Sequence, residues 1–436
     1  MSDTIFALAS GVGHCAISVI RVSGPDADQA LTALCAGASA PAPRRAVLRK
    51  IHHPVSRTLL DEALILRFKA PASFTGEDGF ELHVHGGRAV VAGVLGALGD
   101  CANLRPAQAG EFTRRAFLNG KLDLTEAEGL ADLIDADTAA QRDQALGLAG
   151  GRLRARAQQW RGDILALQAQ VEADIDFSDE GDVPSDVAAD LMRRIKPLRA
   201  DMEAALSEGA RGEMLRRGFT VVLAGAPNAG KSSLLNALAR REVAIVSGIP
   251  GTTRDLIEVS LDLDGLPVTL VDTAGLREAG DEIEEEGIRR AMARAEAADL
   301  VLWLAAPHDG TVPPAFDAPV LWLRTKTDLE PADSAPEHMH ALSAHTGEGV
   351  DELLGMIAAR ARHAIRPEEP ALMTRQRHRQ GIGDATMALG RITTGVPVEV
   401  AAEELRMAAR SLGAIIGLVS PEDVLGEIFG RFCIGK

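Results

Sequence analysis

The sequence lacks the features of a membrane or secreted protein. No apolar run approaches the roughly 18 residues of a transmembrane helix; the longest candidate, Ala89 to Leu98, is short and contains glycine. The segment Met1 to Ala9 has no basic region before an apolar stretch, so we expect no secretory signal. The four cysteines form no CxxC pair, which argues against a disulfide scaffold or zinc ribbon. We therefore expect a cytoplasmic protein.

Positive charge is also scarce. Lys and Arg total 46 against 62 Asp and Glu, and the net charge of −16 argues against non-specific coating of nucleic acid. Only seven lysines occur, so a lysine that remains is a candidate for a role that arginine cannot fill. Four of them lie in the motifs described below: Lys121, Lys231, Lys326 and Lys436.

The chain is long enough for several domains. Its 436 residues are 46% hydrophobic and 25% charged, which excludes wholesale disorder and predicts two or three domains. Apolar periodicity changes along the chain and predicts an α/β multidomain protein in which an α/β domain interrupts a helical one. The predicted parts are an α+β domain (1–120), a first helical part (121–215), an α/β domain with a mainly parallel sheet (216–370) and a second helical part (371–436).

A phosphate-binding motif lies in the predicted α/β domain. Gly225 to Ser232 matches GxxxxGK[ST], after a predicted strand and before a predicted helix, Ser233 to Arg240. Backbone N–H groups and a helix N-terminus in this arrangement bind phosphate. Lys231 is expected to reach the β- and γ-phosphates and Ser232 to bind Mg²⁺.

Further nucleotide motifs follow in order. Asp272 to Gly275 places a carboxylate near the metal, and Thr253 offers it a second hydroxyl. Asp328 can accept the N1–H and amino protons of guanine, and Ser343-Ala344 is similar to a guanine-contacting loop. Together these segments resemble the translation-factor-like GTPases.

The base motif departs from the usual NKxD pattern, because Thr325 stands in place of Asn. A hydroxyl is expected to contact N7 of the base and to order the loop less well than an amide. Selectivity should persist through Asp328, with reduced affinity.

The hydrolytic machinery also departs from Ras-like switches. Leu276 follows the DTAG motif, where a Gln would orient water, and leucine cannot do so. The amide oxygen of Asn228 can hold a monovalent cation beside the β/γ bridge. An acidic run can supply a polar group or simply begin a solvated helix: Asp281, Glu282, Glu284, Glu285 and Glu286.

Motifs at both ends resemble the MnmE (TrmE) family of tRNA modification GTPases, within the TrmE-Era-EngA-like GTPases. They are Ser73 to Asp78, His85 to Gly87, Arg105 to Leu124 and Glu427 to Lys436, which ends in FCIGK. The resemblance spans essentially the whole chain and implies a homodimer whose N-terminal domain binds a one-carbon tetrahydrofolate, in the 5,10-methylene or 5-formyl form. The implied folate contacts are Arg21, Glu81, Lys121 and Lys436.

Charge chemistry is compatible with folate, because a pterin needs a carboxylate for its N–H edge and glutamyl carboxylates need cations. Taken alone, Arg21 and Glu81 are equally compatible with surface or strand-pairing charges. Cys433 resembles a functionally important cysteine of the family, and its role stays open.

The resemblance further implies potassium-dependent dimerisation of the GTPase domains. Potassium contacts map to Asn228, Ser247, Ile249 and Thr252, Mg²⁺ to Ser232 and Thr253, and the catalytic glutamate to Glu284. The full set of implied nucleotide-site residues is Asn228, Ala229, Gly230, Lys231, Ser232, Ser233, Ser247, Gly248, Ile249, Pro250, Gly251, Thr252, Thr253, Asp272, Thr273, Ala274, Gly275, Lys326, Asp328, Ser343 and Ala344.

The implied reaction adds an aminomethyl or carboxymethylaminomethyl group to C5 of the wobble uridine of certain tRNAs. The implied partner is the FAD-dependent MnmG, in a heterotetramer. Arg114-Arg115 and Arg375 to Arg379 are candidate RNA patches or ordinary helix charges. Two other functions stay open: a regulatory switch such as a ribosome-assembly GTPase, and a folate-dependent aminomethyltransferase with an inserted regulatory domain. The FCIGK ending argues against the first.

Overall fold

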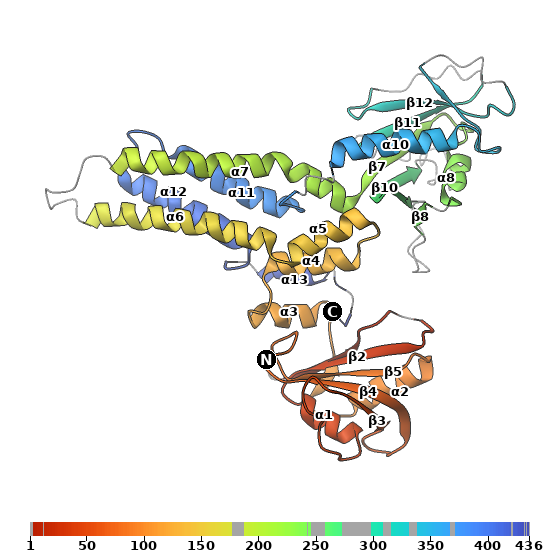
Figure 1. Ribbon diagram of the computed structural model, residues 1–436, viewed down its shortest axis with the longest axis vertical. Coiled ribbons are helices and arrows are strands. Elements are labelled where there is room, and N and C mark those ends of the chain that lie inside the picture. Colours follow the sequence, from red (N-terminus) through yellow and green to blue (C-terminus); the bar gives the residue numbers. More distant parts are fainter. Residues whose placement is uncertain are drawn as a thin grey trace, which may run out of the picture. The chain divides into compact units, whose positions relative to one another are not determined.

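The computed structural model groups the chain into two compact units (Figure 1). One comprises Met1–Ala131 with Gly413–Lys436, and the other Asp132–Leu412. The described residues are 3–11, 13–176, 187–241, 243–245, 258–272, 298–307, 315–330, 338–366, 371–419, 422–430, 432 and 434–435. Within them, no helix combines the length and apolar character of a membrane span.

The first unit is built on a six-stranded sheet in the order β3-β4-β5-β2-β1-β6. Helices α1 (Ala27–Leu34) and α2 (Arg88–Gly99) cover one face, where Leu31, Val94 and Leu82 share an apolar core. The strands and helix predicted around residues 17–22, 81–85 and 90–98 are confirmed. The strands are β1 (Thr4–Leu8), β2 (Ile17–Ser23), β3 (Ala46–His52), β4 (Leu59–Phe68), β5 (Gly79–His85) and β6 (Leu104–Pro106).

The C-terminal residues pack within this first unit. Helix α13 (Glu422–Gly430) contacts α3 (Glu111–Leu118), and Phe429 joins a cluster with Leu124 of α4 (Leu124–Ile134). Ile434 forms an isolated β-bridge with Ala109. Gly110 has φ of 66°, and a Cβ there would lie 2.2 Å from the carbonyl oxygen of Phe429, so this close approach requires glycine. The two ends of the chain therefore build one unit.

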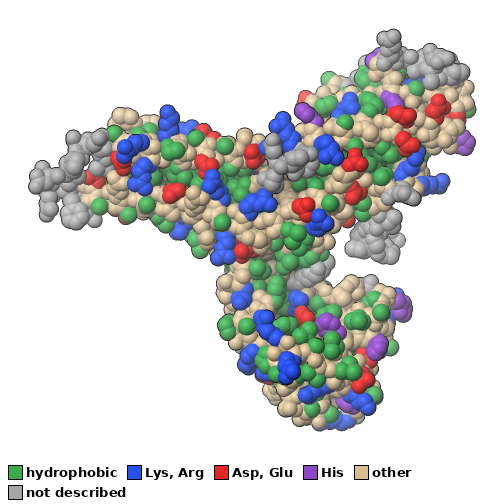
Figure 2. Space-filling model, in the orientation of Figure 1, with side chains coloured by type: hydrophobic (Ala, Val, Ile, Leu, Met, Phe, Trp, Pro, Cys, Tyr) green, Lys and Arg blue, Asp and Glu red, His purple; other side chains and the backbone are tan. Residues whose placement is uncertain are grey.

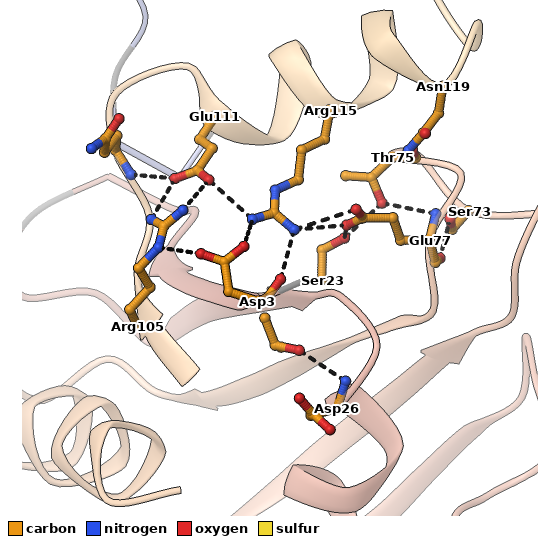
Figure 3. A network of polar contacts seen from close by, with 12 residues as sticks. Asp3, Ser23, Asp26, Ser73, Thr75, Glu77, Arg105, Glu111, Arg115 and Asn119 are labelled. Carbon is orange, nitrogen blue, oxygen red and sulfur yellow. Dashed lines mark hydrogen bonds and ion pairs between the residues drawn. The ribbon is translucent and has the colours of Figure 1, made fainter. Parts of the chain in front are cut away.

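A buried arginine connects several segments of the first unit (Figure 3). The side chain of Arg115, on α3, is 0% exposed and donates to the carboxylates of Asp3, Glu77 and Glu111. Arg105 also donates to Asp3 and Glu111, both at 2.6 Å. A buried charge of this kind needs charged partners, and here they come from the residue before β1, from the loop before β5 and from α3 itself.

These contacts also lower the pKa values of two of the carboxyl groups. Hydrogen bonds from Arg105 and Arg115 hold the pKa of Asp3 below its ordinary 3.8. Burial alone would raise the pKa of Glu111, but hydrogen bonds from Arg105, the Gln108 N–H and Arg115 outweigh it and lower that pKa below 4.5. Both groups are therefore ionised at neutral pH.

Long helices form one part of the second unit. They are α5 (Ala139–Ala149), α6 (Arg152–Asp176), α7 (Val187–Arg217), α11 (Gln376–Arg391) and α12 (Val398–Ile415). The buried Trp160 of α6 donates its indole N–H to Asp201 of α7 at 2.5 Å, which fixes these two helices against each other. The last residue of α7, Arg217, is separated from the first strand of the α/β part by Gly218 alone.

A seven-stranded sheet forms the α/β part, in the order β13-β12-β11-β7-β10-β9-β8. Strands β13, β12, β11, β7 and β10 run parallel, whereas β9 is antiparallel to β10 and β8. The four predicted strands are confirmed, and β8, β9 and β13 are additional. The elements are β7 (Phe219–Gly225), α8 (Lys231–Ala239), β8 (Ala244–Ile245), β9 (Glu258–Leu263), β10 (Leu266–Asp272), β11 (Leu300–Ala305), β12 (Val320–Arg324), β13 (His340–Ala341) and α10 (Val350–Ile365).

We predict that Arg115→Met lowers the free energy of unfolding of the first unit by about 3 kcal/mol at pH 7, because it removes the arginine partner of Glu77 and one of the two arginine partners of Asp3 and Glu111. Since the pKa values of Asp3 and Glu111 are depressed, the Arg115 contribution is present above their unfolded values and is lost as pH falls through the folded ones. The difference from wild type should therefore shrink below about pH 4. Denaturant unfolding combined with hydrogen exchange measures this difference in the free energy of unfolding at each pH. Arg88→Met, an exposed arginine of the same unit, is the control; equal losses in both variants at pH 7 would contradict the prediction.

Candidate functional site

The phosphate loop connects β7 to α8. Gly225 ends the strand with φ of 146°, and a Cβ there would lie 2.3 Å from the carbonyl oxygen of Leu304, so only glycine fits. Gly230, with φ of 96°, caps α8, whose first residues are Lys231 and Ser232. The helix thus begins two residues before the predicted Ser233, because the end of the motif forms its first turn. Asn228 is exposed in this loop with φ of 62°, and Ala229 is buried.

The cation and hydroxyl of the motif have partners within the protein. The Lys231 ammonium donates to the carbonyls of Gly225 and Ala226 at 2.8 and 2.9 Å. The Ser232 hydroxyl donates to Asp272 at 2.8 Å, and Asp272 is 0% exposed at the end of β10. A hydroxyl and a carboxylate oxygen side by side are ligands that suit Mg²⁺, so this pair fits the expected metal. Ser233 is exposed in the same turn.

The loop predicted to contact the guanine base, Thr325 to Asp328, follows β12. Lys326 has a left-handed φ of 60°, and Asp328 is exposed beyond it. The Ser343 hydroxyl donates to Asp328 Oδ1 at 2.7 Å and lowers the pKa of that carboxyl, so Asp328 is ionised at neutral pH. Ser343 also accepts the N–H groups of His345 and Thr346, both at 3.2 Å, which fixes the Ser343-Ala344 loop. The two predicted base-contacting segments therefore lie together.

Thr325 differs from the expectation. Its hydroxyl donates to the carbonyl of Ala229 in the phosphate loop at 2.7 Å, and the residue is 3% exposed. In this arrangement Ala229 takes the hydroxyl proton that the expected contact with N7 of a base would need. The sequence could not reveal the bond, because Ala229 is 96 positions away.

All of these groups lie at one edge of the sheet. The phosphate loop follows β7, Asp272 ends β10, and the base segments follow β12 and β13, which are parallel strands. The carboxyl edge of such a sheet is where α/β proteins bind nucleotides. Other predicted site residues lie outside the described residues: Ser247, Gly248, Ile249, Pro250, Gly251, Thr252, Thr253, Thr273, Ala274, Gly275, Glu284 and Lys436.

A second cluster lies on the sheet of the first unit. Arg21 and Glu81 are opposite each other on β2 and β5, and their side chains form an ion pair at 3.0 Å. The Arg21 guanidinium also lies 5.3 Å from the ring centre of Phe74 and 5.7 Å from that of Phe112. Lys121 donates to the carbonyl of Pro71, at the other end of the loop that carries Phe74.

This cluster combines an ion pair with aromatic rings, a set that fits a flat, charged heterocycle. The two phenylalanines were missed as candidates, although Phe74 lies inside the quoted Ser73 to Asp78 motif. The strand pairing of Arg21 with Glu81, one of the two interpretations, is present.

Two arginines of the candidate RNA patches are less exposed than expected. Arg115 is fully buried in the network of Figure 3 and cannot contribute to a surface patch. Arg375 is 14% exposed and donates to Asp132 at 2.6 Å. On the face drawn in Figure 2, Lys and Arg side chains are interspersed with Asp and Glu.

Comparisons with known proteins cover the chain from end to end. The family model "GTP-binding protein TrmE N-terminus" matches residues 4–121, and "MnmE helical domain" matches residues 124–433. The tRNA modification GTPase MnmE of Rhodopseudomonas palustris (strain ATCC BAA-98 / CGA009) is 52% identical over 439 residues, which covers all of this chain and 99% of that protein. The protein of the same name from Methylobacterium sp. (strain 4-46) is 53% identical over 443 residues and is covered completely, as is this chain. This chain therefore belongs to the MnmE family of tRNA modification GTPases.

Proposed function

We propose that the protein hydrolyses GTP and that its nucleotide cycle drives modification of C5 of the wobble uridine in certain tRNAs, by an aminomethyl or carboxymethylaminomethyl group. The observation that carries the nucleotide part is the convergence of the phosphate loop, the Ser232–Asp272 pair and the Asp328–Ser343 pair at one sheet edge. Family membership supports the tRNA part.

The described residues have distinct roles in GTP binding. Phosphate oxygens displace the loop carbonyls from Lys231, while backbone N–H groups at the start of α8 bind the same phosphates. Ser232 and Asp272 hold Mg²⁺, which neutralises charge on the β- and γ-phosphates when bound. Asp328 accepts the N1–H and 2-amino protons of guanine; adenine has no hydrogen on N1 and no amino group at C2.

We further propose that Asn228 contributes its amide oxygen to a potassium site, with Ser247, Ile249 and Thr252. The left-handed backbone of Asn228 and its exposed side chain support this role. A potassium ion held by these residues would supply positive charge to the phosphate bond that breaks, and we propose that it acts when two GTPase domains pair. Thr253 completes the Mg²⁺ site, and Glu284 orients water.

The first unit is proposed to bind a 5,10-methylene or 5-formyl tetrahydrofolate. Glu81 faces the pterin N–H edge, and Arg21, Lys121 and Lys436 attract the glutamyl carboxylates; the ion pair and the two nearby rings support this. The net charge of −16 favours a partner that carries much of the tRNA contact. We propose that this partner is FAD-dependent MnmG, that two copies of each chain assemble, and that the reaction is cytoplasmic.

We predict that Glu284→Ala binds GDP within about twofold of wild type but loses GTP turnover by about 10²-fold or more, because water loses its orienting carboxylate. Calorimetry and phosphate release measure the two effects, with Glu286→Ala as the control.

Mass analysis of tRNA from cells lacking the protein should show wobble uridine without its C5 group, restored by wild type and not by Glu284→Ala. Normal turnover in Glu284→Ala would assign the role to another residue, and unchanged tRNA in the deletion strain would overturn the proposed pathway.

Hydrolysis should be at least about tenfold faster in potassium than in sodium chloride at equal ionic strength, as expected if a cation replaces an arginine finger. Asn228→Gly keeps the positive φ available while removing the amide oxygen, so it should lose this advantage without losing GDP affinity. Steady-state rates in the two salts test this. Identical wild-type rates in both would remove the proposed cation site.

We expect 5-formyltetrahydrofolate to bind, and Arg21→Ala or Lys121→Met to weaken it by roughly 10- to 100-fold, the range of a lost charge-assisted hydrogen bond. Lys50→Met, an exposed lysine of β3, is the matched control. Calorimetric titration gives the affinity, and thermal melting verifies folding. Equal affinity in all four proteins would place the folate elsewhere.

A further inference from the structure

We propose that Thr325 ties the base-binding loop to the phosphate loop, and that the site therefore recognises guanine without a side-chain donor to N7. This inference rests on the proposed GTP binding and specifies how that site recognises its base.

The hydrogen bond between Thr325 and Ala229, called the tie below, joins segments that follow separate strands. Thr325 follows β12, Ala229 lies in the loop after β7, and β11 lies between these two strands in the sheet. The Thr325 hydroxyl donates to the Ala229 carbonyl at 2.7 Å and lies 3.3 Å from that of Ala305. The backbone N–H of Thr325 donates to the same Ala305 carbonyl at 3.0 Å. A Cβ on Gly230 would lie 3.9 Å from Thr325, so the side chain packs directly against the phosphate loop.

Counting protons determines what Thr325 can offer a ligand. A hydroxyl has one proton, whereas the amide of asparagine has two. Guanine N7 carries a lone pair and no hydrogen, so a contact to it needs a donor. The one proton of Thr325 is used by Ala229, which is itself 0% exposed, and turning it toward a base would leave a buried carbonyl without that partner.

Selectivity for guanine does not depend on N7 in this arrangement. Asp328 accepts from Ser343 through Oδ1 at 2.7 Å, and Ser343 is itself fixed by two backbone N–H groups. The carboxylate is thereby positioned as an acceptor for the N1–H and amino protons. Adenine has no hydrogen on N1 and no amino group at C2, and N7 is common to the two purines.

The test compares GDP with 7-deaza-GDP, in which a C–H group replaces N7, by calorimetry on the full-length protein with Mg²⁺. Wild type should bind both within about twofold. Thr325→Asn gains a second donor and should prefer GDP by roughly 3- to 10-fold, the value of one neutral hydrogen bond. A tenfold wild-type preference for GDP would overturn the inference, because another group would then contact N7.

The tie itself is tested by Thr325→Val, which keeps the side-chain shape and removes the hydroxyl. It should weaken GDP and 7-deaza-GDP alike, by about tenfold, and Thr325→Ser should restore both. Unchanged affinity in a folded Thr325→Val protein would show that the tie does not position the site. If that variant does not fold, the ratio of GDP to 7-deaza-GDP affinity in the serine and asparagine variants still tests the N7 part of the inference.

A GDP and ADP comparison separates this inference from the proposed function. Wild type should prefer GDP strongly, and Asp328→Asn should lose that preference. No preference for GDP in wild type would overturn guanine recognition as a whole. A strong preference for GDP combined with tenfold weaker 7-deaza-GDP would overturn only the N7 inference.

Discussion

Parallel strand pairing is the constraint on which the nucleotide site depends. Strands that run parallel end at the same edge, so segments far apart in sequence meet there without any direct attraction between them. Strand β7 pairs with β10 and β11, and β12 pairs with β11 and β13. This pairing alone brings Lys231, Asp272 and Asp328 to one edge. The bonds between Ser232 and Asp272, and between Ser343 and Asp328, then refine positions that the sheet has already set.

The first unit depends on a different kind of constraint, which is buried charge. Arg115 is enclosed by carboxylates from three separate segments, and each would be costly to leave unpaired. The arrangement therefore specifies a single register between α3, the start of β1 and the loop that carries Glu77. The same loop carries Phe74, which lies over Arg21. Charge that is buried for stability thus positions the residues proposed to bind folate.

Local patterns were readable from the sequence, and long-range contacts were not. The phosphate loop is defined by residues a few positions apart, so Gly225 and Lys231 could be placed correctly on a strand-to-helix turn. The pairing of Arg21 with Glu81 needed the strand register, which residue types leave open. The burial of Arg115 could not be predicted from an Arg-Arg pair, because it depends on two carboxylates distant in sequence, Asp3 and Glu77, as well as on Glu111 one helical turn away. The changes in apolar periodicity indicated several domains. That the C-terminal residues return to the first unit could not be predicted in this way, because it depends on packing around Phe429.

The hydrogen bonds at the sheet edge that carries the phosphate loop fall into two classes. In the first class a ligand has to replace the protein acceptor, and in the second the bond within the protein is kept. Lys231 and Ser232 already have protein acceptors, so a phosphate or a metal ion that bound to them would have to replace these acceptors, and its affinity would be the small difference between two bonded arrangements. By the inference drawn above, Thr325 belongs to the second class, because we expect its bond to Ala229 to be kept when a nucleotide binds. A bond that is not exchanged contributes no direct ligand contact, yet it reduces the ordering cost of bringing two loops to one ligand. Under that inference, replacing an amide by a hydroxyl at this position keeps the preorganisation and gives up the contact to the base, and Asp328 is then the residue that we expect to distinguish guanine from adenine.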